Sequence, residues 1–567
     1  MEPSAADRAF TELARDYLDD RAQRHPNLAT DLGDHRFDAL LPEYSAAAFE
    51  SERRVQDRWA ARLAAIDTAA LSAEMQVDAG MLGNAIERRI FELDELRSHT
   101  WNPLEANPGQ PVHALLARDF APLPDRLAAV AGRLAQIPAL LAGARSLLTA
   151  MPQVHLETAI GQFTGTISVV SDEIDAALAD EALRSAPGCQ AQIEAVRPAA
   201  LAALSAHRDW LSARLEEGKS GGGFADPRLG AERFARKLSL TLDARADSAA
   251  ILARAEADLD RVSEEIGQLA AELAGTGWAP SESPALTRQV LDQLAADTTD
   301  DTSILQFCRD ALAGTTAFTR EHDLITLYDD PVEVIAMPEI DRGVAAAYCD
   351  SPGPLETAPV PTFVAVSPTP QGWPADRVAS FYREYNRHMI HNLMVHEAMP
   401  GHFAQLQHSR RFRGGAAELR AALRSGSFVE GWAVHAEEVM AVAGYPGEGD
   451  PRAVRMQRLK MELRMIINAI LDAKVHGQGM TEAQAMALMT DRGHQEEGEA
   501  VGKWRRALLT SAQLSTYYVG YTEISDLAGE LTAAHPGLSQ REIHDRMLAH
   551  GSPPVRRLRT LLVGPER

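Results

Sequence analysis

The stretch that decides both fold and chemistry in this chain is His396-Glu397-Ala398-Met399-Pro400-Gly401-His402, which holds two imidazoles and a carboxylate within seven residues. A further carboxylate follows in Phe428-Val429-Glu430-Gly431-Trp432-Ala433. Two neutral histidines and one carboxylate are a common ligand set for catalytic zinc, with a fourth position open to water. The two segments together predict a metal site.

The spacing of the two histidines departs from the simplest zinc motif. In H-E-x-x-H the histidines lie four residues apart on one helical face, and the Glu is the general base. Here Pro400 takes the fourth position, and six residues along an ideal helix leave two side chains about 120° apart. Pro and Gly permit a bulge or break, so we predict a bend at Pro400-Gly401 that returns His402 toward His396. The alternative is a helix that simply stops at Pro-Gly, with an ordinary His402 beyond it.

Two glutamates of the second segment lie seven residues apart and therefore share a helical face. A carboxylate at Glu430, beside Trp432 on an apolar helix, is costly unless it is paired or bound to a metal. Glu437 is a candidate partner for the second ring nitrogen of a metal-bound histidine. The alternative for both carboxylates is a buried salt bridge or a solvated face.

Two later segments contain groups that are able to donate to an oxyanion near zinc. One runs from Ile470 to Gly477 and includes Asp472 and His476, and the other runs from Gln513 to Tyr521 and includes Tyr517. Spacing alone leaves open the alternative of core aromatics with satisfied hydroxyl groups.

Composition predicts a mainly α fold. The chain has 567 residues, which is more than one compact core usually fills. We expect an N-terminal helical region at 1–220 and a metal-site region at 221–567, joined in one bilobed structure. Apolar runs at Val332–Met337 and Val360–Val366 predict a small β-sheet at about 330–367, just before the histidine motif.

Charge and cysteine usage exclude several classes of protein. The net charge of −24 disfavours binding to nucleic acid and to anionic membranes. Three widely spaced cysteines give neither a disulfide framework nor a cysteine metal site. The N-terminus lacks the basic and apolar regions of a signal peptide, and no apolar run reaches the length of a membrane span. We therefore expect a cytoplasmic protein without nucleic-acid or membrane partners, and the oligomeric state has no signature in the sequence.

These segments together resemble a widespread bacterial family long labelled only as a domain of unknown function, whose hallmark is HEAxPGH. The resemblance spans nearly the whole chain, and the segments that carry it are His25–Gly33, Arg228–Phe234, His396–His402, Phe428–Ala433, Asp472 with His476, and Thr516–Gly520. That family in turn resembles gluzincin peptidases of the thimet-oligopeptidase and carboxypeptidase-Taq types.

The resemblance implies a large helical body with a deep channel and a small sheet next to the zinc-binding helix. By the same resemblance, the zinc ligands would be His396, His402 and Glu430, and the general base would be Glu397. The oxyanion donors would be Tyr517 and His476, and the supporting carboxylates would be Glu437 and Asp472. The strand with Thr362, Phe363 and Val364 would hold an extended substrate through its backbone.

The chain departs from the family pattern outside the proposed ligand set. Asn468 stands where the family usually has Arg, and Ser511-Ala512 stands where Pro-Gly is frequent. The usual Arg-Pro-Gly is not evident in Leu355–Pro361. These departures affect substrate recognition, above all the binding of a carboxylate by Arg.

The leading functional hypothesis is a zinc-dependent hydrolase that cleaves peptide or related amide bonds in short substrates, with Glu397 as general base on zinc-bound water. Histidine and carboxylate ligands also suit Mn²⁺ or Co²⁺. One alternative is a metal-dependent amide hydrolase of secondary metabolism with a non-peptide substrate. A second alternative, from another class, is a non-catalytic helical binding scaffold with a retired site.

Overall fold

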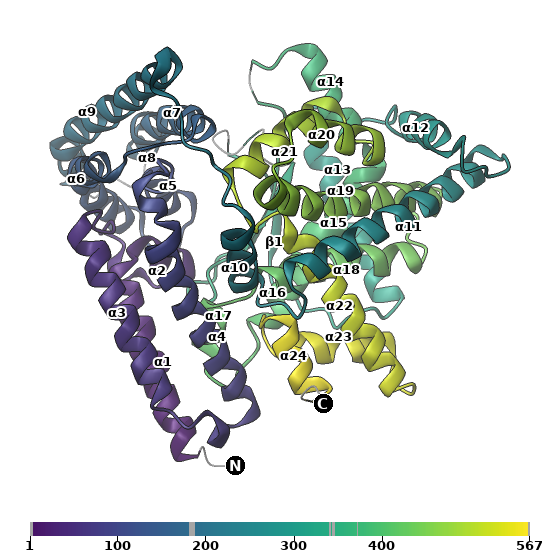
Figure 1. Ribbon diagram of the computed structural model, residues 1–567, viewed down its shortest axis with the longest axis horizontal. Helices are drawn as coiled ribbons and strands as arrows, with labels where there is room; N and C mark the ends of the chain where they lie inside the picture. Colours follow the sequence, from purple (N-terminus) through teal and green to yellow (C-terminus); the bar gives the residue numbers. More distant parts are fainter. Residues whose placement is uncertain (1–3, 181–187, 339–341, 343–345, 371, 565–567) are drawn as a thin grey trace. The chain divides into compact units, whose positions relative to one another are not determined.

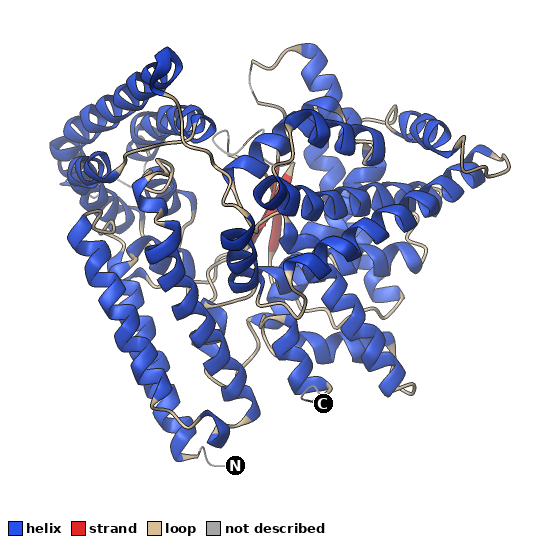
Figure 2. Ribbon diagram, viewed as in Figure 1, coloured by secondary structure: helices blue, strands red, loops and turns tan. Residues whose placement is uncertain are grey.

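The computed structural model describes residues 4–180, 188–338, 342, 346–370 and 372–564. It is mainly helical and contains a small three-stranded sheet (Figures 1 and 2), which confirms the predicted fold class at that level. Its contacts divide the chain into two units, Met1–Pro227 with Pro352–Val360, and Arg228–Ser351 with Pro361–Arg567.

The first unit is built from helices whose apolar faces pack against one another. They are α1 (Ala5–Arg24), α2 (Pro26–Leu32), α3 (Ala46–Ala64), α4 (Ala73–Phe91), α5 (Gly109–Ala117), α6 (Leu123–Leu147), α7 (Gln153–Ser168), α8 (Ile174–Leu178) and α9 (Gly188–Glu217). Helix α6 packs against α9, and its Leu127, Val130 and Leu134 are fully buried, as the apolar period of this segment predicts.

Helix α6 also qualifies as a membrane span by length and composition, and it is the only helix of the described residues that does. Its most apolar stretch has a mean hydropathy of 1.5, and half of that stretch is buried inside the structure. The expectation that no segment reaches such a length is therefore wrong for α6. Core helices of water-soluble proteins meet the same criterion, so α6 by itself gives no argument for a membrane.

The second unit contains the sheet and most of the motifs described above. Its helices are α10 (Ala231–Leu242), α11 (Ser248–Ala274), α12 (Ser283–Leu294), α13 (Ile304–Glu321), α14 (Ala375–Glu384), α15 (Arg387–Glu397), α16 (His402–Ser409), α17 (Ala417–Ala422), α18 (Gly426–Val442), α19 (Pro451–Gln478), α20 (Glu482–Ala487), α21 (Glu497–Leu509), α22 (Ser515–Ala534), α23 (Gln540–Leu548) and α24 (Val555–Leu562). Helix α11 packs along α19, and α18 packs against α22.

The sheet has the strand order β1-β3-β2, with β1 at Val332–Ala336, β2 at Ala347–Asp350 and β3 at Thr362–Val366. Strand β1 runs parallel to β3, and β2 runs antiparallel to it. Both edges of β3 are therefore hydrogen-bonded within the sheet. Because a strand needs a free edge to pair with a peptide, the predicted substrate-binding role of Thr362, Phe363 and Val364 through their backbone is wrong.

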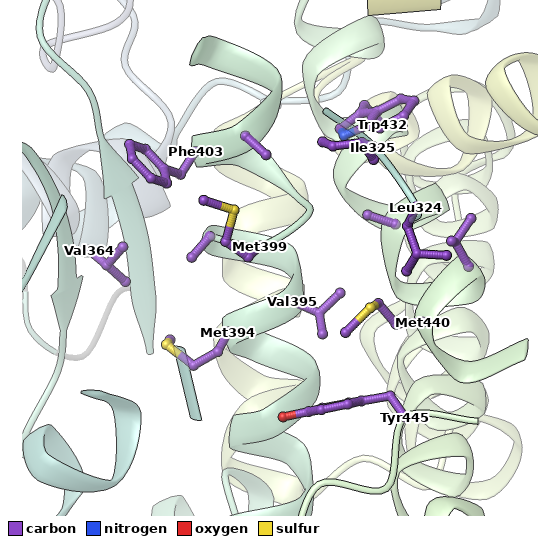
Figure 3. Close-up of a cluster of buried hydrophobic side chains, with 14 of the residues drawn as sticks. Leu324, Ile325, Val364, Met394, Val395, Met399, Phe403, Trp432, Met440 and Tyr445 are labelled. Carbon is purple, nitrogen blue, oxygen red and sulfur yellow. The ribbon is translucent and has the colours of Figure 1, made fainter. Parts of the chain in front are cut away.

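A buried apolar cluster fixes α15 and α16 between the sheet and α18. Figure 3 shows side chains of α15, the following turn and α16 with Val364 of β3 on one side and residues of α18 on the other. The labelled members are Leu324, Ile325, Val364, Met394, Val395, Met399, Phe403, Trp432, Met440 and Tyr445. This packing holds the two histidine-bearing helices in place without using their histidines.

Candidate metal centre

The histidine motif folds as two helices joined by a tight turn. Helix α15 ends at Glu397, and α16 begins at His402. The peptide bond between Met399 and Pro400 is cis, and the Trp432 indole N–H donates to the Pro400 carbonyl oxygen at 2.9 Å. The rings of His396 and His402 come to a centroid distance of 4.6 Å. The chain thus makes the predicted bend by ending one helix and starting another.

Gly401 is required in this turn by close approach of the backbone. A Cβ atom at this position would lie 2.0 Å from the carbonyl oxygen of His396 and 2.3 Å from that of Val395. The Gly401 N–H donates to the same Val395 oxygen at 3.0 Å. Any larger residue would push the turn away from α15, and with it the start of α16 that carries His402.

Helix α18 brings Glu430 to the two histidines. One Glu430 carboxylate oxygen, Oε2, lies 3.5 Å from His396 Nε2 and 3.4 Å from His402 Nε2. The ligand atoms of these three residues all lie within 4.8 Å of one another. Tetrahedral zinc with bonds of about 2.0–2.1 Å keeps its ligand atoms about 3.3 Å apart. The donor set and its spacing therefore fit a zinc ion.

The ring of His396 is oriented by a carboxylate on its far side. Glu437, two turns after Glu430 on α18, places Oε1 2.7 Å from His396 Nδ1. The other oxygen of Glu437 accepts from Asn392 Nδ2 at 2.7 Å. These contacts assign the proton to His396 Nδ1 and leave Nε2 to face Glu430, which is the usual support for a metal-bound histidine. Asn392 was missed from the sequence, although its place four residues before His396 puts both on one helical face.

The charges of the cluster suit a cation. Burial would lower the pKa of His396, but hydrogen bonds to Glu430 and Glu437 raise this pKa well above its ordinary value. Burial would likewise raise the pKa of Glu430, but His402 and His396 hold it well below its ordinary value. The Glu430 carboxylate, held ionised beside the two histidines, attracts positive charge, which either a proton or a metal ion supplies.

Glu397, next to the first histidine, is buried and faces the same cluster. Burial raises its pKa, partly offset by His396 and His402, and the backbone N–H of Cys349 in β2 hydrogen-bonds to its carboxylate. Strand β2 thus contacts the candidate general base. A carboxylate with a raised pKa is better matched to accepting and returning a proton near neutral pH.

Asp472 and His476 lie on α19 and hold the turn that precedes α22. Asp472 accepts from the backbone N–H groups of Ala512 and Ser515, each at 3.0 Å. Nε2 of His476 lies 2.9 Å from the carbonyl oxygen of Ala507 and 2.8 Å from that of Thr510. These contacts hold the turn in place. The predicted roles of His476 as an oxyanion donor and of Asp472 as a supporting carboxylate stay predictions.

Tyr517 lies in the first turn of α22. Its hydroxyl accepts from Arg506 Nη2 at 3.1 Å and from Gln513 Nε2 at 3.3 Å. Helix α22 crosses α18 at very short range, since a Cβ on Gly431 would lie 2.2 Å from the carbonyl carbon of Gly520. The predicted role of Tyr517 as an oxyanion donor stays a prediction. Arg506 was missed from the sequence because nothing in its surroundings marks it.

Comparisons with known proteins place this architecture in a wider group. A family model described as a bacterial protein of unknown function (DUF885) matches residues 26–562. A putative lipoprotein of unknown function from Shewanella oneidensis has a similar structure, with a TM-score of 0.83 and 30% identity over 98% of this chain and 99% of that chain. A putative lipoprotein from Colwellia psychrerythraea, with a TM-score of 0.80 and 16% identity over 99% and 100%, shares the fold. No curated protein matches the chain.

Proposed function

The chain belongs to the bacterial family of unknown function DUF885, and from its candidate metal centre we propose that it is a zinc-dependent hydrolase of peptide or related amide bonds in short substrates. One observation carries this proposal: Glu430 Oε2 lies 3.5 Å and 3.4 Å from the Nε2 atoms of two histidines that belong to separate helices. Such convergence of three buried or half-buried donor groups is costly unless a ligand joins them.

Each residue of the centre has its own role in the proposed reaction. His396, His402 and Glu430 would hold the ion, and Glu437 keeps His396 in the orientation that this requires. Zinc bound there would act as a Lewis acid that polarises the scissile carbonyl and acidifies a water molecule. The Glu397 carboxylate takes a proton from the attacking water and passes it to the nitrogen of the leaving amine.

The likeness to gluzincin peptidases is part of the same proposal. It favours an oligopeptidase or a carboxypeptidase-like enzyme over a general protease, because a channel in a helical body admits short substrates. Tyr517 is retained as the oxyanion donor, and its hydroxyl is already oriented by Arg506 and Gln513. Because β3 is fully paired, substrate has to be held by other groups than the backbone of that strand.

We also propose where in the cell the protein lies. The two similar structures are named putative lipoproteins, a name that indicates attachment at the cell envelope for those proteins. By that likeness we favour an envelope location over the cytoplasmic one expected from the sequence. Fractionation of cells that express the natural gene would test this, and recovery with the cytoplasmic fraction alone would contradict it.

Mass spectrometry of a short-peptide library incubated with zinc-loaded enzyme tests the activity. We expect cleavage products from the wild type and a rate lower by about 10²–10⁴-fold for Glu397→Gln, which should still bind zinc. Full turnover in that variant, with contaminating peptidase excluded, would remove the mechanism. Bound zinc without any peptide cleavage would favour an amide hydrolase with a specialised substrate.

A further inference from the structure

A cavity of about 450 Å³ lies in the second unit, lined by residues of α12, α14, α19 and α20 and of the segment before α21. The lining residues that matter here are Arg288, Asn386, Gln457, Lys460, Gln495 and Glu497. The metal-centre residues are not among its lining residues. Asn386 caps α15, whose other end carries His396, and eleven residues of helix span about 16 Å. The cavity is therefore a separate place in the same unit.

The floor of the cavity consists of buried amide side chains. Gln457 is 1% exposed and Gln495 is 3% exposed. Oε1 of Gln457, and both Oε1 and Nε2 of Gln495, have no hydrogen-bond partner in the part of the chain that the structure describes. Buried polar atoms are almost always hydrogen-bonded, because an unmade bond there is expensive. The volume lies in the range of ordinary small-molecule sites.

Other charged groups of the cavity already have partners of opposite charge. Arg383 pairs with Asp292 at 2.6 Å, and Lys460 pairs with Glu384 at 2.8 Å. With the further 3.7 Å contact between Arg383 and Glu496, these ion pairs engage both cationic groups on that side of the cavity. They also hold α14 against α12 and α19, so the walls of the cavity are fixed before any ligand arrives.

Two exposed lining residues of the cavity carry opposite charges. Arg288 is exposed, and its Nη2 donates to the uncharged carbonyl oxygen of Thr490 at 2.8 Å. Glu497 is exposed in the first turn of α21. A guanidinium with a neutral partner retains its charge for a carboxylate, and a surface carboxylate suits an ammonium group.

We propose that this cavity binds a small zwitterion that carries an amide, the chemistry shared by a dipeptide and by free glutamine. Arg288 takes the carboxylate, and Glu497 takes the ammonium group. The carbonyl oxygen of the ligand's amide accepts from Gln495 Nε2. The amide N–H donates to Oε1 of Gln495 or of Gln457. This site rests on the cavity alone and does not depend on the proposed hydrolase activity.

Isothermal titration calorimetry of the full chain with glycylglycine, glutamine and glycine tests the proposal. Glycylglycine or glutamine should bind, and glycine, which has no amide, should bind about tenfold more weakly. Binding of glycylglycine alone identifies peptides as the source of the ligand, and binding of glutamine alone identifies amino acids. The absence of binding by both would overturn the proposal.

Four variants locate the binding. Gln495→Leu and Arg288→Gln should each weaken binding about tenfold, whereas the matched control Gln293→Leu, at an exposed position of α12, should not. Glu430→Gln, which alters the metal centre, should bind as the wild type does. Binding that survives both Gln495→Leu and Arg288→Gln, or that Glu430→Gln abolishes, would place the ligand elsewhere and overturn the proposal. Arg288 is exposed, so its variant remains informative if Gln495→Leu does not fold.

Discussion

Glu437 illustrates how a residue without contact to substrate can control the centre. Its carboxylate lies 2.7 Å from His396 Nδ1 and accepts from Asn392 at the same distance. We predict that Glu437→Gln lowers the affinity for zinc about 10–100-fold, because the charge that supports the imidazole is lost. Competition with a chromophoric chelator measures this, with Glu418→Gln, at an exposed site on α17, as the control. An unchanged affinity in Glu437→Gln would contradict this role.

His207 on α9 gives the first unit a dependence on pH. Its ring is fully buried between Phe163 and Trp210, and burial lowers its pKa from 6.5 to about 4. Between these values the unfolded chain binds a proton that the folded chain excludes, so stability falls as pH falls from about 6.5 to about 4. Since a tenfold change in proton affinity is about 1.4 kcal/mol, the loss amounts to about 3 kcal/mol.

Thermal unfolding followed across this pH range checks the prediction. The melting temperature of His207→Leu should fall less on acidification than that of the wild type, whereas His535→Leu, at an exposed position, should follow the wild type. A wild-type pH profile retained in His207→Leu would show that other groups are responsible.

At the residue scale the sequence predicts which residues could bind a metal better than it predicts the contacts that support those residues. His396, His402 and Glu430 are named by residue type and motif, and the structure brings them together. Asn392 and Arg506 could not be found in the same way, because each acts through a partner on another helix. Their importance depends on which helices are neighbours, and a single sequence does not contain that information.

The turn between α15 and α16 is the element on which the centre depends. We predict that Gly401→Ala lowers the free energy of unfolding by about 1–3 kcal/mol, because its Cβ would collide with backbone oxygens that have no room to move. The same variant should bind zinc more weakly. Gly498→Ala on α21, where nothing lies within 4 Å of the added atom, should be neutral or stabilising by up to about 1 kcal/mol. Equal stability of the two variants would contradict the close approach.

Elements with strong local patterns could be predicted, and elements defined by pairing could not. The apolar period of Ile251, Leu259 and Val262 predicts α11, and the apolar runs predict β1 and β3. Strand β2 was missed because Ala347–Asp350 is short and partly polar, and it becomes a strand by pairing with β3. The predicted substrate-binding role of β3 came from the family resemblance alone, and β2 pairs with the edge that a bound peptide would need.

The whole molecule shows a connection that composition does not reveal. Between β2 and β3 the chain leaves the second unit, and Pro352–Val360 belongs to the first. There the Leu355 N–H donates to the Leu32 carbonyl oxygen at 2.8 Å, and His35 lies 2.8 Å from a carboxylate oxygen of Glu356. These pairs join residues more than three hundred positions apart, so no local pattern could have predicted them.

Zinc content of the purified whole protein tests the central claim most directly. After loading with zinc and exhaustive buffer exchange, elemental analysis should find one equivalent of zinc per wild-type chain and per Glu418→Gln control. Glu430→Gln should retain much less, because it loses the charged ligand that joins the two histidines. A wild-type protein without stoichiometric zinc, or a Glu430→Gln variant that holds a full equivalent, would contradict the account.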